Sequence, residues 1–346
     1  MRSVLSRHIY SQIIPRVGTC KLAVPVAGAC RTSFCAQPLY RRFNNMAAPT
    51  FTDAVVKAMK TLYPPELADS AWDNTGLLLD QAILPEGTEA KQGGGAVLLT
   101  NDLTAAVVDE ALEKQVNIIV SYHPVIFRPL KSLSNQDPMQ KHLLRLIAAR
   151  IAVYCPHTAV DAARGGLNDW LCDIILDNES KAADRKVVQP ISRPLPESLQ
   201  GLGYGRTMKL QGPMPLTNIL KNLSRGLGDQ QHMSIALPHP RKDLKDVNIS
   251  TVSVCAGSGS SVLKDTDAEL IVTGEMDHHS ALRYTQLGQT VVTVFHSNSE
   301  RQYLTQVLKP ELEQMLSQSS RAEGKVLVSQ ADRDPFETID ISSLSS

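Results

Sequence analysis

The stretch Asn117-Ile-Ile-Val-Ser-Tyr-His-Pro-Val-Ile-Phe127 is a short apolar run that reaches His123 and is stopped by Pro124. Short runs of apolar and β-branched residues predict strands that are buried on both faces, as in parallel sheets covered by helices. Two more such runs also end next to a histidine: residues 151–155 before His157, and residues 290–295 before His296. Ligand sites collect outside the carboxyl ends of parallel strands, so we predict that these strand ends share one site.

Two of these histidines are followed at the fourth position by a carboxylate, His157 by Asp161 and His296 by Glu300. At the start of a helix this spacing places both side chains on one face. Imidazole nitrogen together with carboxylate oxygen suits zinc, iron or manganese. A single strand-end histidine is usually solvated, and a single pair of this kind is usually a surface contact. Three such strand ends in one chain favour a divalent-metal site.

The N-terminal region has a composition of its own. Residues 1–50 hold seven basic residues and no Asp or Glu, and the whole chain balances 35 Lys and Arg against 35 Asp and Glu, so the remainder is mildly acidic. An Arg-rich, acid-free N-terminus resembles a mitochondrial transit peptide. We therefore assign residues 1–45 to a transit peptide, or else to a disordered basic extension. The first reading places the protein in the mitochondrion; a translation start at Met46 would place it in the cytoplasm and nucleus.

The composition of the chain limits its class. Its 346 residues, 42% of them hydrophobic, suffice for two ordinary domains. It has no run of apolar residues long enough to span a membrane. The mildly acidic body argues against direct nucleic-acid binding, which usually requires a basic patch. Cys155, Cys172 and Cys255 form no Cys-x-x-Cys motif, so neither a disulfide framework nor a zinc ribbon is indicated.

Alternating strand and helix patterns divide the rest of the chain. We predict an N-terminal α/β half at residues 46–180, a proline-punctuated connecting segment at 181–248, and a C-terminal α/β half at 249–346 that completes the metal site. Gly201 is interpreted as a turn into an antiparallel strand. The predicted fold class is α/β, with two similar βα-rich halves whose mixed sheets face each other across the site.

Three features near the predicted strand ends have two interpretations each. The loop Gly257-Ser258-Gly259 is consistent with an anion site or with tight packing. Glu275 ends a predicted strand, and is interpreted as a proton carrier or as a structural carboxylate that holds His278 or His279. Trp72 is more often a core anchor than a ligand contact.

These motifs together resemble the GTP cyclohydrolase 1 type 2 / NIF three-like family. The matching stretches keep the family's order over roughly residues 51–340: Trp72-Asp-Asn-Thr-Gly-Leu77, Ser121-Tyr-His-Pro-Val-Ile-Phe127, His157-Thr-Ala-Val-Asp161, Cys255-Ala-Gly-Ser-Gly259, Thr273-Gly-Glu275 and His296-Ser-Asn-Ser-Glu300. The resemblance implies two similar α/β halves, a ring-like homohexamer built from dimers, and a paired divalent-metal site.

Carried over to this chain, the resemblance implies four metal ligands: His123, Asp161, His296 and Glu300, with Glu300 able to bridge two ions. His157 would be a further ligand or would support one. Many bacterial members have two adjacent histidines where this chain has Tyr122 and His123. A tyrosine hydroxyl must lose a proton with a pKa of about 10 before it binds a cation well. The sequence therefore leaves open whether each chain binds one ion or two.

Two functions remain open at this stage. The first is a metal-dependent hydrolase of a small phosphorylated or nucleotide-like substrate, in which a cation activates water. The family's cyclohydrolase label would require a purine-sized pocket, which the sequence does not show. The second is a scaffold or transcription-related regulatory protein whose metal is structural, as the family's naming after a transcription-adaptor interaction suggests.

Overall fold

The computed structural model describes residues 50–80, 94–177, 184–240, 243–318 and 323–341. All of them belong to the second of two compact units, which spans Ala48–Ser346. The transit peptide or basic extension predicted at residues 1–45 lies outside the described residues. Among the described helices, none is long and apolar enough to cross a membrane.

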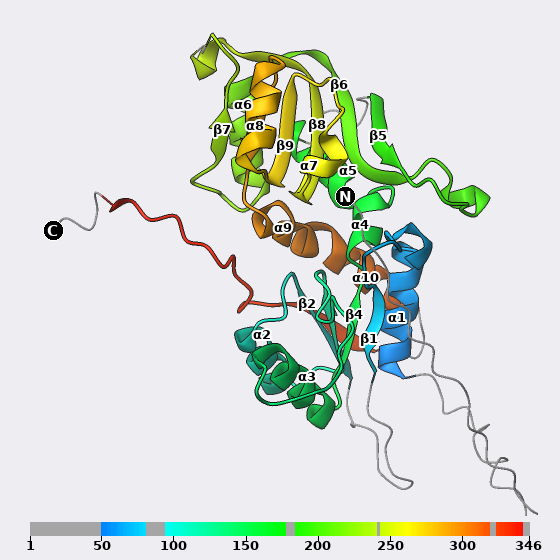
Figure 1. Ribbon diagram of the computed structural model, residues 1–346. Coiled ribbons are helices and arrows are strands. Elements are labelled where there is room, and N and C mark those ends of the chain that lie inside the picture. The colour runs from blue at the N-terminus through cyan, green and yellow to red at the C-terminus, as the bar shows by residue number, and fades with distance from the viewer. Residues whose placement is uncertain (1–49, 81–93, 178–183, 241–242, 319–322, 342–346) are drawn as a thin grey trace, which may run out of the picture. The chain divides into compact units, whose positions relative to one another are not determined.

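The first sheet has the strand order β1-β4-β3-β2-β11 (Figure 1). Its strands are β1 (Gly76–Leu79), β2 (Gly95–Thr100), β3 (Ile118–Ser121), β4 (Ala152–Cys155) and β11 (Gly324–Val328). The central pairs β11·β2, β2·β3 and β3·β4 are parallel, and β1 is antiparallel to β4. The sheet is therefore mixed, as predicted, and its parallel strands are the short apolar runs of the sequence.

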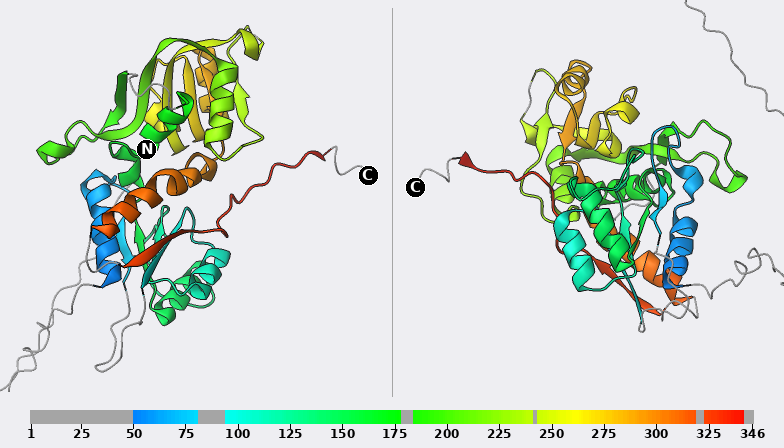
Figure 2. Two further views of the ribbon diagram at one scale, coloured as in Figure 1. Left: turned by 180° about the vertical axis from the view of Figure 1, so that it is seen from behind. Right: turned by 60° about the horizontal axis from the view of Figure 1, so that its bottom comes forward.

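Neighbouring residues of a strand enter different cores on the two faces of this sheet, as the two-residue period of a strand requires. Leu98 of β2 packs with α2 (Ala105–Glu113) and α3 (Pro138–Ala149), through residues such as Val107 and Leu146. Val97 and Leu99 belong to the other core, together with Met59 of α1 (Phe51–Leu62). Figure 2 shows α2 and α3 side by side on one face, where the helices contact each other.

The second sheet has the strand order β5-β6-β8-β9-β10-β7. Its strands are β5 (Asp184–Pro190), β6 (Gly203–Pro215), β7 (Ser234–Ala236), β8 (Asn248–Ser258), β9 (Leu270–Glu275) and β10 (Thr290–Thr293). β8, β9 and β10 are parallel, whereas β5, β6 and β7 join by antiparallel pairing. The antiparallel strand predicted after Gly201 is β6, and the second sheet is also mixed.

Helices cover both faces of the second sheet (Figure 1). Leu270 and Val272 of β9 belong to the large core that also contains Leu171 of α5 (Leu167–Ile175) and Ile219 of α6 (Leu216–Gly226). Ile271 belongs to a small core with Leu263 of α7 (Ser260–Leu263) and Tyr284 of α8 (His278–Gln286). The remaining helical elements are α4 (Thr158–Ala162), α9 (Arg301–Tyr303), α10 (Lys309–Ser317), η2 (Pro65–Leu67), η3 (Glu197–Leu199), η4 (Leu244–Asp246), η5 (Ser297–Ser299) and η6 (Leu304–Leu308).

The helices begin where the sequence offers capping groups. Thr50 and Asp53 form a reciprocal capping box at α1, so side-chain oxygens satisfy backbone N–H groups that have no partner inside the helix. The Asp137 carboxylate accepts a hydrogen bond from the backbone N–H of Gln140 at the start of α3, where Pro138 fits the first helical position.

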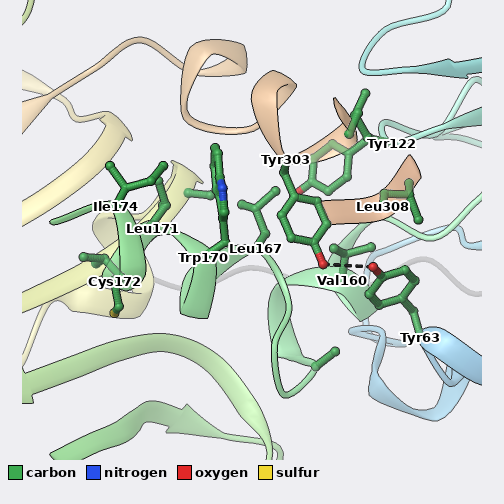
Figure 3. Close-up of a cluster of buried hydrophobic side chains, with 14 of the residues drawn as sticks. Tyr63, Tyr122, Val160, Leu167, Trp170, Leu171, Cys172, Ile174, Tyr303 and Leu308 are labelled. Atoms are coloured by element: carbon green, nitrogen blue, oxygen red, sulfur yellow. Dashed lines mark hydrogen bonds between the residues drawn. The ribbon is translucent and has the colours of Figure 1, made fainter. Parts of the chain in front are cut away.

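The helical stretch made by α9, η6 and α10 belongs to the core that extends from one sheet to the other. The hydroxyl groups of Tyr303 and of Tyr63, at the end of α1, are joined by a hydrogen bond of 2.9 Å (Figure 3). The Tyr63 hydroxyl also donates a hydrogen bond to Glu311. The Tyr303 ring meets that of Trp170 in α5 at a centroid distance of 5.7 Å. This stretch therefore links α1 to α5.

Strand pairing departs from the predicted division of the chain in two places. The segment predicted as a connection, 181–248, contributes β5, β6 and β7 to the second sheet. The last strand, β11, returns to the first sheet beside β2 instead of joining the C-terminal half. Both differences come from long-range pairing, which is not visible in local periodicity. The division into halves itself stays a prediction.

Candidate metal site and its pocket

Two histidines from different sheets meet at the predicted strand ends. His123 follows β3 of the first sheet and His296 lies just beyond β10 of the second. Their Nε2 atoms are 3.3 Å apart, and their ring centroids are 5.2 Å apart. Two imidazoles in this arrangement aim their lone pairs at the same small volume.

Glu300 supplies a carboxylate to the same volume. Its Oε2 lies 3.5 Å from Nε2 of His123, and its Oε1 lies 3.5 Å from Nε2 of His296. The side chain is only 2% exposed, and it accepts a 3.0 Å hydrogen bond from the Asn101 amide. Burial raises the pKa of Glu300 to about 8. A buried carboxylate of this kind is stabilised in its charged form by a nearby cation.

A carboxylate holds the far side of each histidine ring. Asp102 Oδ1 lies 2.9 Å from Nδ1 of His123, and Glu275 Oε1 lies 3.0 Å from Nδ1 of His296. Burial raises the pKa of Asp102, but the hydrogen bond from His123 outweighs it, so the pKa lies below its usual value. A carboxylate beside Nδ1 favours the tautomer with its hydrogen on Nδ1, which would leave each Nε2 available to a cation.

The donor set fits a divalent cation. The ligand atoms of His123, His296 and Glu300 all lie within 4.8 Å of one another. Two neutral imidazoles and one carboxylate suit zinc and other first-row cations. Among the residues that the structure describes, this is the group of His, Cys, Asp and Glu that comes close enough to hold an ion.

Asp161 and Tyr122 pair with each other next to this group. The Tyr122 hydroxyl donates a 2.7 Å hydrogen bond to Asp161 Oδ1. Burial raises the pKa of Asp161, and it raises the pKa of Tyr122 well above its usual value, so the tyrosine keeps its proton. Three of the four ligands implied by the resemblance therefore come together. They form a close group of His123, His296 and Glu300, and Asp161 lies outside this close group. Its role as a ligand stays a prediction.

His157 is bound to a different partner. Its Nδ1 lies 2.7 Å from Asp73 Oδ1, and the Asp73 carboxylate also accepts a hydrogen bond from the Thr158 hydroxyl. Burial raises the pKa of Asp73, but the hydrogen bond from His157 outweighs it and the pKa lies below its usual value. The His157 ring meets the His123 ring edge-on, with the ring centroids 5.4 Å apart. This position fits a residue that supports a ligand better than it fits a further member of the close group.

The close group opens onto a cavity of about 480 Å³. This volume lies within the range of small-molecule sites, about 300–1,000 Å³. The lining includes Tyr122, His123, Asp161, His296 and Glu300 together with Gly257 and Ser258. It also includes Trp72, which is 52% exposed, so the prediction that Trp72 anchors the core is wrong.

The glycine loop after β8 lies against the ligands. The Gly257 N–H donates to the Ser299 hydroxyl and the Gly259 N–H donates to the Thr273 hydroxyl, so two amides of the predicted anion loop are already used. A Cβ on Gly257 would lie 2.7 Å from Glu300 Oε1 and 3.2 Å from His296 Nε2. These contacts favour tight packing for the loop; anion binding stays a prediction.

The positions of Glu275 and Asp102 show what sequence reasoning missed. Glu275 contacts His296, whereas the structural alternative had assigned it to His278 or His279. Asp102 was not predicted as a site residue, although it follows a buried strand as His123 does. The expectation that ligand sites collect at the carboxyl ends of parallel strands, applied to β2 as well, would have predicted Asp102.

Comparison with known families identifies the fold. The family model described as Duf34/NIF3 (NGG1p interacting factor 3) matches residues 51–335. The chain belongs to the Duf34/NIF3 family. The matched range includes the whole candidate site, from Trp72 to Glu300.

Several Duf34/NIF3 relatives match most of the chain. NGG1-interacting factor 3 of Saccharomyces cerevisiae is 41% identical over 82% of this chain and 96% of its own length. Protein NIF3 homolog of Schizosaccharomyces pombe is 40% identical, covering 85% of this chain and all of its own length (100%). NIF3-like protein 1 of Homo sapiens is 28% identical, covering 78% of this chain and 88% of its own length.

Solved structures share the Duf34/NIF3 fold. A Bacillus cereus protein related to NIF3 aligns with a TM-score of 0.67 at 21% identity, over 82% of this chain and 98% of its own. Reduced HcgD from Methanocaldococcus jannaschii aligns with a TM-score of 0.58 at 21% identity, over 79% of this chain and 96% of its own. These likenesses show the common fold alone.

Proposed function

We propose that this protein is a divalent-metal-dependent hydrolase of a small phosphorylated or nucleotide-like molecule. The observation that carries the proposal is the convergence of His123, His296 and Glu300 beside a cavity of about 480 Å³. Catalytic zinc sites typically have three protein ligands, whereas structural sites usually have four. A cation bound by such a set supplies an activated water, whose pKa falls to about 7.

The chain's own residues orient this site. Asp102 and Glu275 accept hydrogen bonds from the two Nδ1 atoms and hold the Nε2 atoms toward the shared volume. Asn101 donates to Glu300 and fixes the direction of its carboxylate. The Glu275 side chain is 54% exposed, so it is in contact with solvent, as a proton carrier must be. Glu275 is therefore proposed as both a support for His296 and a proton carrier.

We propose one ion per chain. The Tyr122 hydroxyl keeps its proton and donates a hydrogen bond to Asp161. Tyr122 therefore offers no ligand with which Asp161 could hold a second cation. Tyr122→Ala would only open space, whereas Tyr122→His adds an imidazole beside Asp161. We expect Tyr122→His to raise the metal content of the purified protein from about one toward about two ions per chain, as measured by elemental analysis. An unchanged content would contradict this explanation of the metal number.

Hydrolysis is tested with purified full-length protein loaded with zinc, manganese or iron(II). We expect turnover of at least one member of a panel of phosphomonoesters and nucleotides, and loss of that turnover in His296→Ala. Asp267→Ala, a change at an exposed acid on the same half of the chain, is the control and should keep activity. A metal-loaded wild type without turnover across the panel would contradict the proposal.

A regulatory function is the second candidate. The observation that favours it is the name of the yeast relative, NGG1-interacting factor 3, which refers to a protein partner of that relative. On this proposal the metal would stabilise the fold and a surface would bind a partner. His123→Ala and Glu300→Ala variants that still fold would then leave the cellular phenotype intact, whereas the hydrolase proposal expects both variants to behave as a null allele.

A further inference from the structure

We propose that Trp72 and Phe127 form an aromatic wall that binds the planar heteroaromatic ring of the small molecule at this site, as in a nucleotide base. The proposal rests on the proposed function for the location of the reacting bond and adds the chemical class of the substrate. It commits to a ring-bearing ligand rather than to a sugar phosphate or another ligand without a ring.

The two side chains of the aromatic wall are unusually accessible for their size. Trp72 is 52% exposed and Phe127 is 48% exposed, and both line the cavity of the metal group. The second tryptophan, Trp170, is only 6% exposed and belongs to the core. Leaving large aromatic surface in water costs free energy that a bound ring recovers, since aromatic contacts combine apolar burial with a favourable ring geometry.

The rings of the aromatic wall do not cover each other. Their centroids are 5.9 Å apart and their planes are inclined by 49°. This tilt is not a parallel stack, and both rings line the cavity. Stacking on aromatic side chains is tolerant of base identity because every base has a π-face. The aromatic wall therefore predicts recognition of a ring without strict choice among purines.

The aromatic wall is held in place before any ligand binds. Asp69 N–H donates to the Thr158 hydroxyl over 2.9 Å, and the Asp73 N–H donates to the Asp69 carbonyl over 2.9 Å, which fixes the turn that carries Trp72. The Asn74 amide donates to the Ile126 carbonyl and fixes the segment that carries Phe127. Because these segments are already ordered, binding requires little loss of conformational entropy.

The aromatic wall and the metal group lie along one series of rings. Trp72 meets His157 at 5.8 Å, His157 meets His123 at 5.4 Å, and His123 meets His296 at 5.2 Å, all as centroid distances. All four rings line the same cavity. A molecule whose ring lies on the aromatic wall can thus extend a polar substituent toward His123, where the reacting bond would be. A nucleoside monophosphate has this form.

Fluorescence of Trp72 tests the proposal directly, because the chain has only two tryptophans. Trp170→Phe leaves Trp72 as the sole reporter in the full-length, zinc-loaded protein. We expect adenosine 5′-monophosphate to quench this fluorescence with a dissociation constant at least tenfold lower than that of ribose 5-phosphate, which carries the same phosphate without the ring. Since Trp170 donates a hydrogen bond to Gln306, calorimetry on the protein with Trp170 intact repeats the comparison in case Trp170→Phe fails to fold.

Phe127→Ala examines the second side chain of the aromatic wall. We expect it to weaken binding of adenosine 5′-monophosphate about 5-fold to 150-fold, the range given by the loss of one base–aromatic stack. Phe336→Ala is the matched control, because Phe336 is 79% exposed and does not line the cavity; it should leave the affinity unchanged. Equal binding of the two ligands, no binding of either, or full affinity in Phe127→Ala would each overturn the proposal.

Turnover and Phe127-dependent binding, measured on the same samples, separate this proposal from the proposed function. If the hydrolase proposal fails but the aromatic wall is correct, the wild type shows no turnover, but it binds adenosine 5′-monophosphate more tightly than Phe127→Ala does. If the hydrolase proposal is correct but the aromatic wall is not, turnover is metal-dependent, and Phe127→Ala leaves the dissociation constant of adenosine 5′-monophosphate unchanged.

Discussion

At the scale of single residues, the orientation of two histidine rings depends on two carboxylates. Asp102 binds Nδ1 of His123, and Glu275 binds Nδ1 of His296. We expect Asp102→Asn and Glu275→Gln each to weaken metal binding about 10-fold to 100-fold, because such outer partners fix the tautomer and raise the basicity of the ligand nitrogen. Competition with a fluorescent zinc chelator measures the affinity.

Asp267→Asn is the control for this prediction. Asp267 is exposed, and the substitution removes the same charge, so the variant should bind metal as the wild type does. Wild-type affinity in both Asp102→Asn and Glu275→Gln would show that these carboxylates do not position the histidines.

Gly257 is the second residue on which the site depends. A Cβ there would lie 2.7 Å from Glu300 Oε1, and the residue has a φ of +59°, which side chains rarely adopt. We expect Gly257→Ala to weaken metal binding at least tenfold, because Glu300 must move away from both histidines. The same chelator competition measures this, and circular dichroism establishes that the variant is folded.

Gly201→Ala separates backbone strain from the clash with Glu300. Gly201 has a φ of +76°, but nothing lies within 4 Å of an added Cβ. It should therefore lower the free energy of unfolding by about 1 kcal/mol or more while leaving metal affinity unchanged. If Gly201→Ala lost metal as well, a general loss of stability would explain both variants.

The sequence indicated which residues are candidates for the site more readily than which of these candidates contact one another. Apolar runs ending in histidine led to His123 and His296, and the i,i+4 spacing led to Glu300. The same two patterns also selected His157 and Asp161, which lie beside the close group with partners of their own. Which strand-end side chains converge depends on rotamers and on long-range packing, and neither is encoded in spacing along the chain.

At the scale of elements, Glu110 joins α2 to the end of β11. Its carboxylate accepts hydrogen bonds from the Ser329 hydroxyl and from the backbone N–H groups of Gln330 and Ala331, and it pairs with Lys114. Burial raises the pKa of Glu110, but these donors outweigh it and lower the pKa from 4.5 to about 2. The carboxylate is therefore stabilised in the folded protein.

The depressed pKa of Glu110 makes this contribution pH-dependent. The stabilisation is fully present above pH 4.5, the unfolded value, and is lost as the pH falls toward about 2. We expect Glu110→Gln to lower the free energy of unfolding at pH 7 by about 1–2 kcal/mol, and by less at about pH 3, as measured by urea unfolding. Glu113→Gln, an exposed change on the same helix, should have little effect at either pH. A pH-independent deficit in Glu110→Gln would contradict the account.

Elements with a strong apolar period were predictable, and the others were not. The apolar runs gave β3, β4 and β10, and the strand predicted to end at Glu275 is β9. β5 and β7 lie at the two edges of the second sheet and lack a continuous apolar run, so they were missed. The stretch from α9 to α10 was also missed, although it joins the core between the sheets.

At the scale of the whole molecule, the candidate site depends on both sheets. His123 follows a strand of the first sheet, whereas His296 and Glu300 follow a strand of the second. Neither group alone gives three ligands. The fold therefore has to bring two distant parts of the sequence together before a cation can bind, and metal binding should in turn stabilise the folded chain.

The end of the chain shows the limit of sequence reasoning at this scale. The position of β11 beside β2 of the first sheet follows from pairing over most of the chain length. After β11, residues 329–341 run on as an extended segment (Figure 2). The Asp332 carboxylate at its start accepts a hydrogen bond from Asn101 N–H, so this segment begins next to the residues that support Glu300.

Metal content per chain is the most direct test of the central claim. It is measured by elemental analysis of the full-length protein after loading with zinc and removal of unbound ions, for the wild type, for His296→Ala and for the exposed control Asp267→Ala. We expect about one ion per chain in the wild type and the control, and much less in His296→Ala. A wild type that retains no metal, or a His296→Ala variant that retains as much as the wild type, would contradict the assignment of this site.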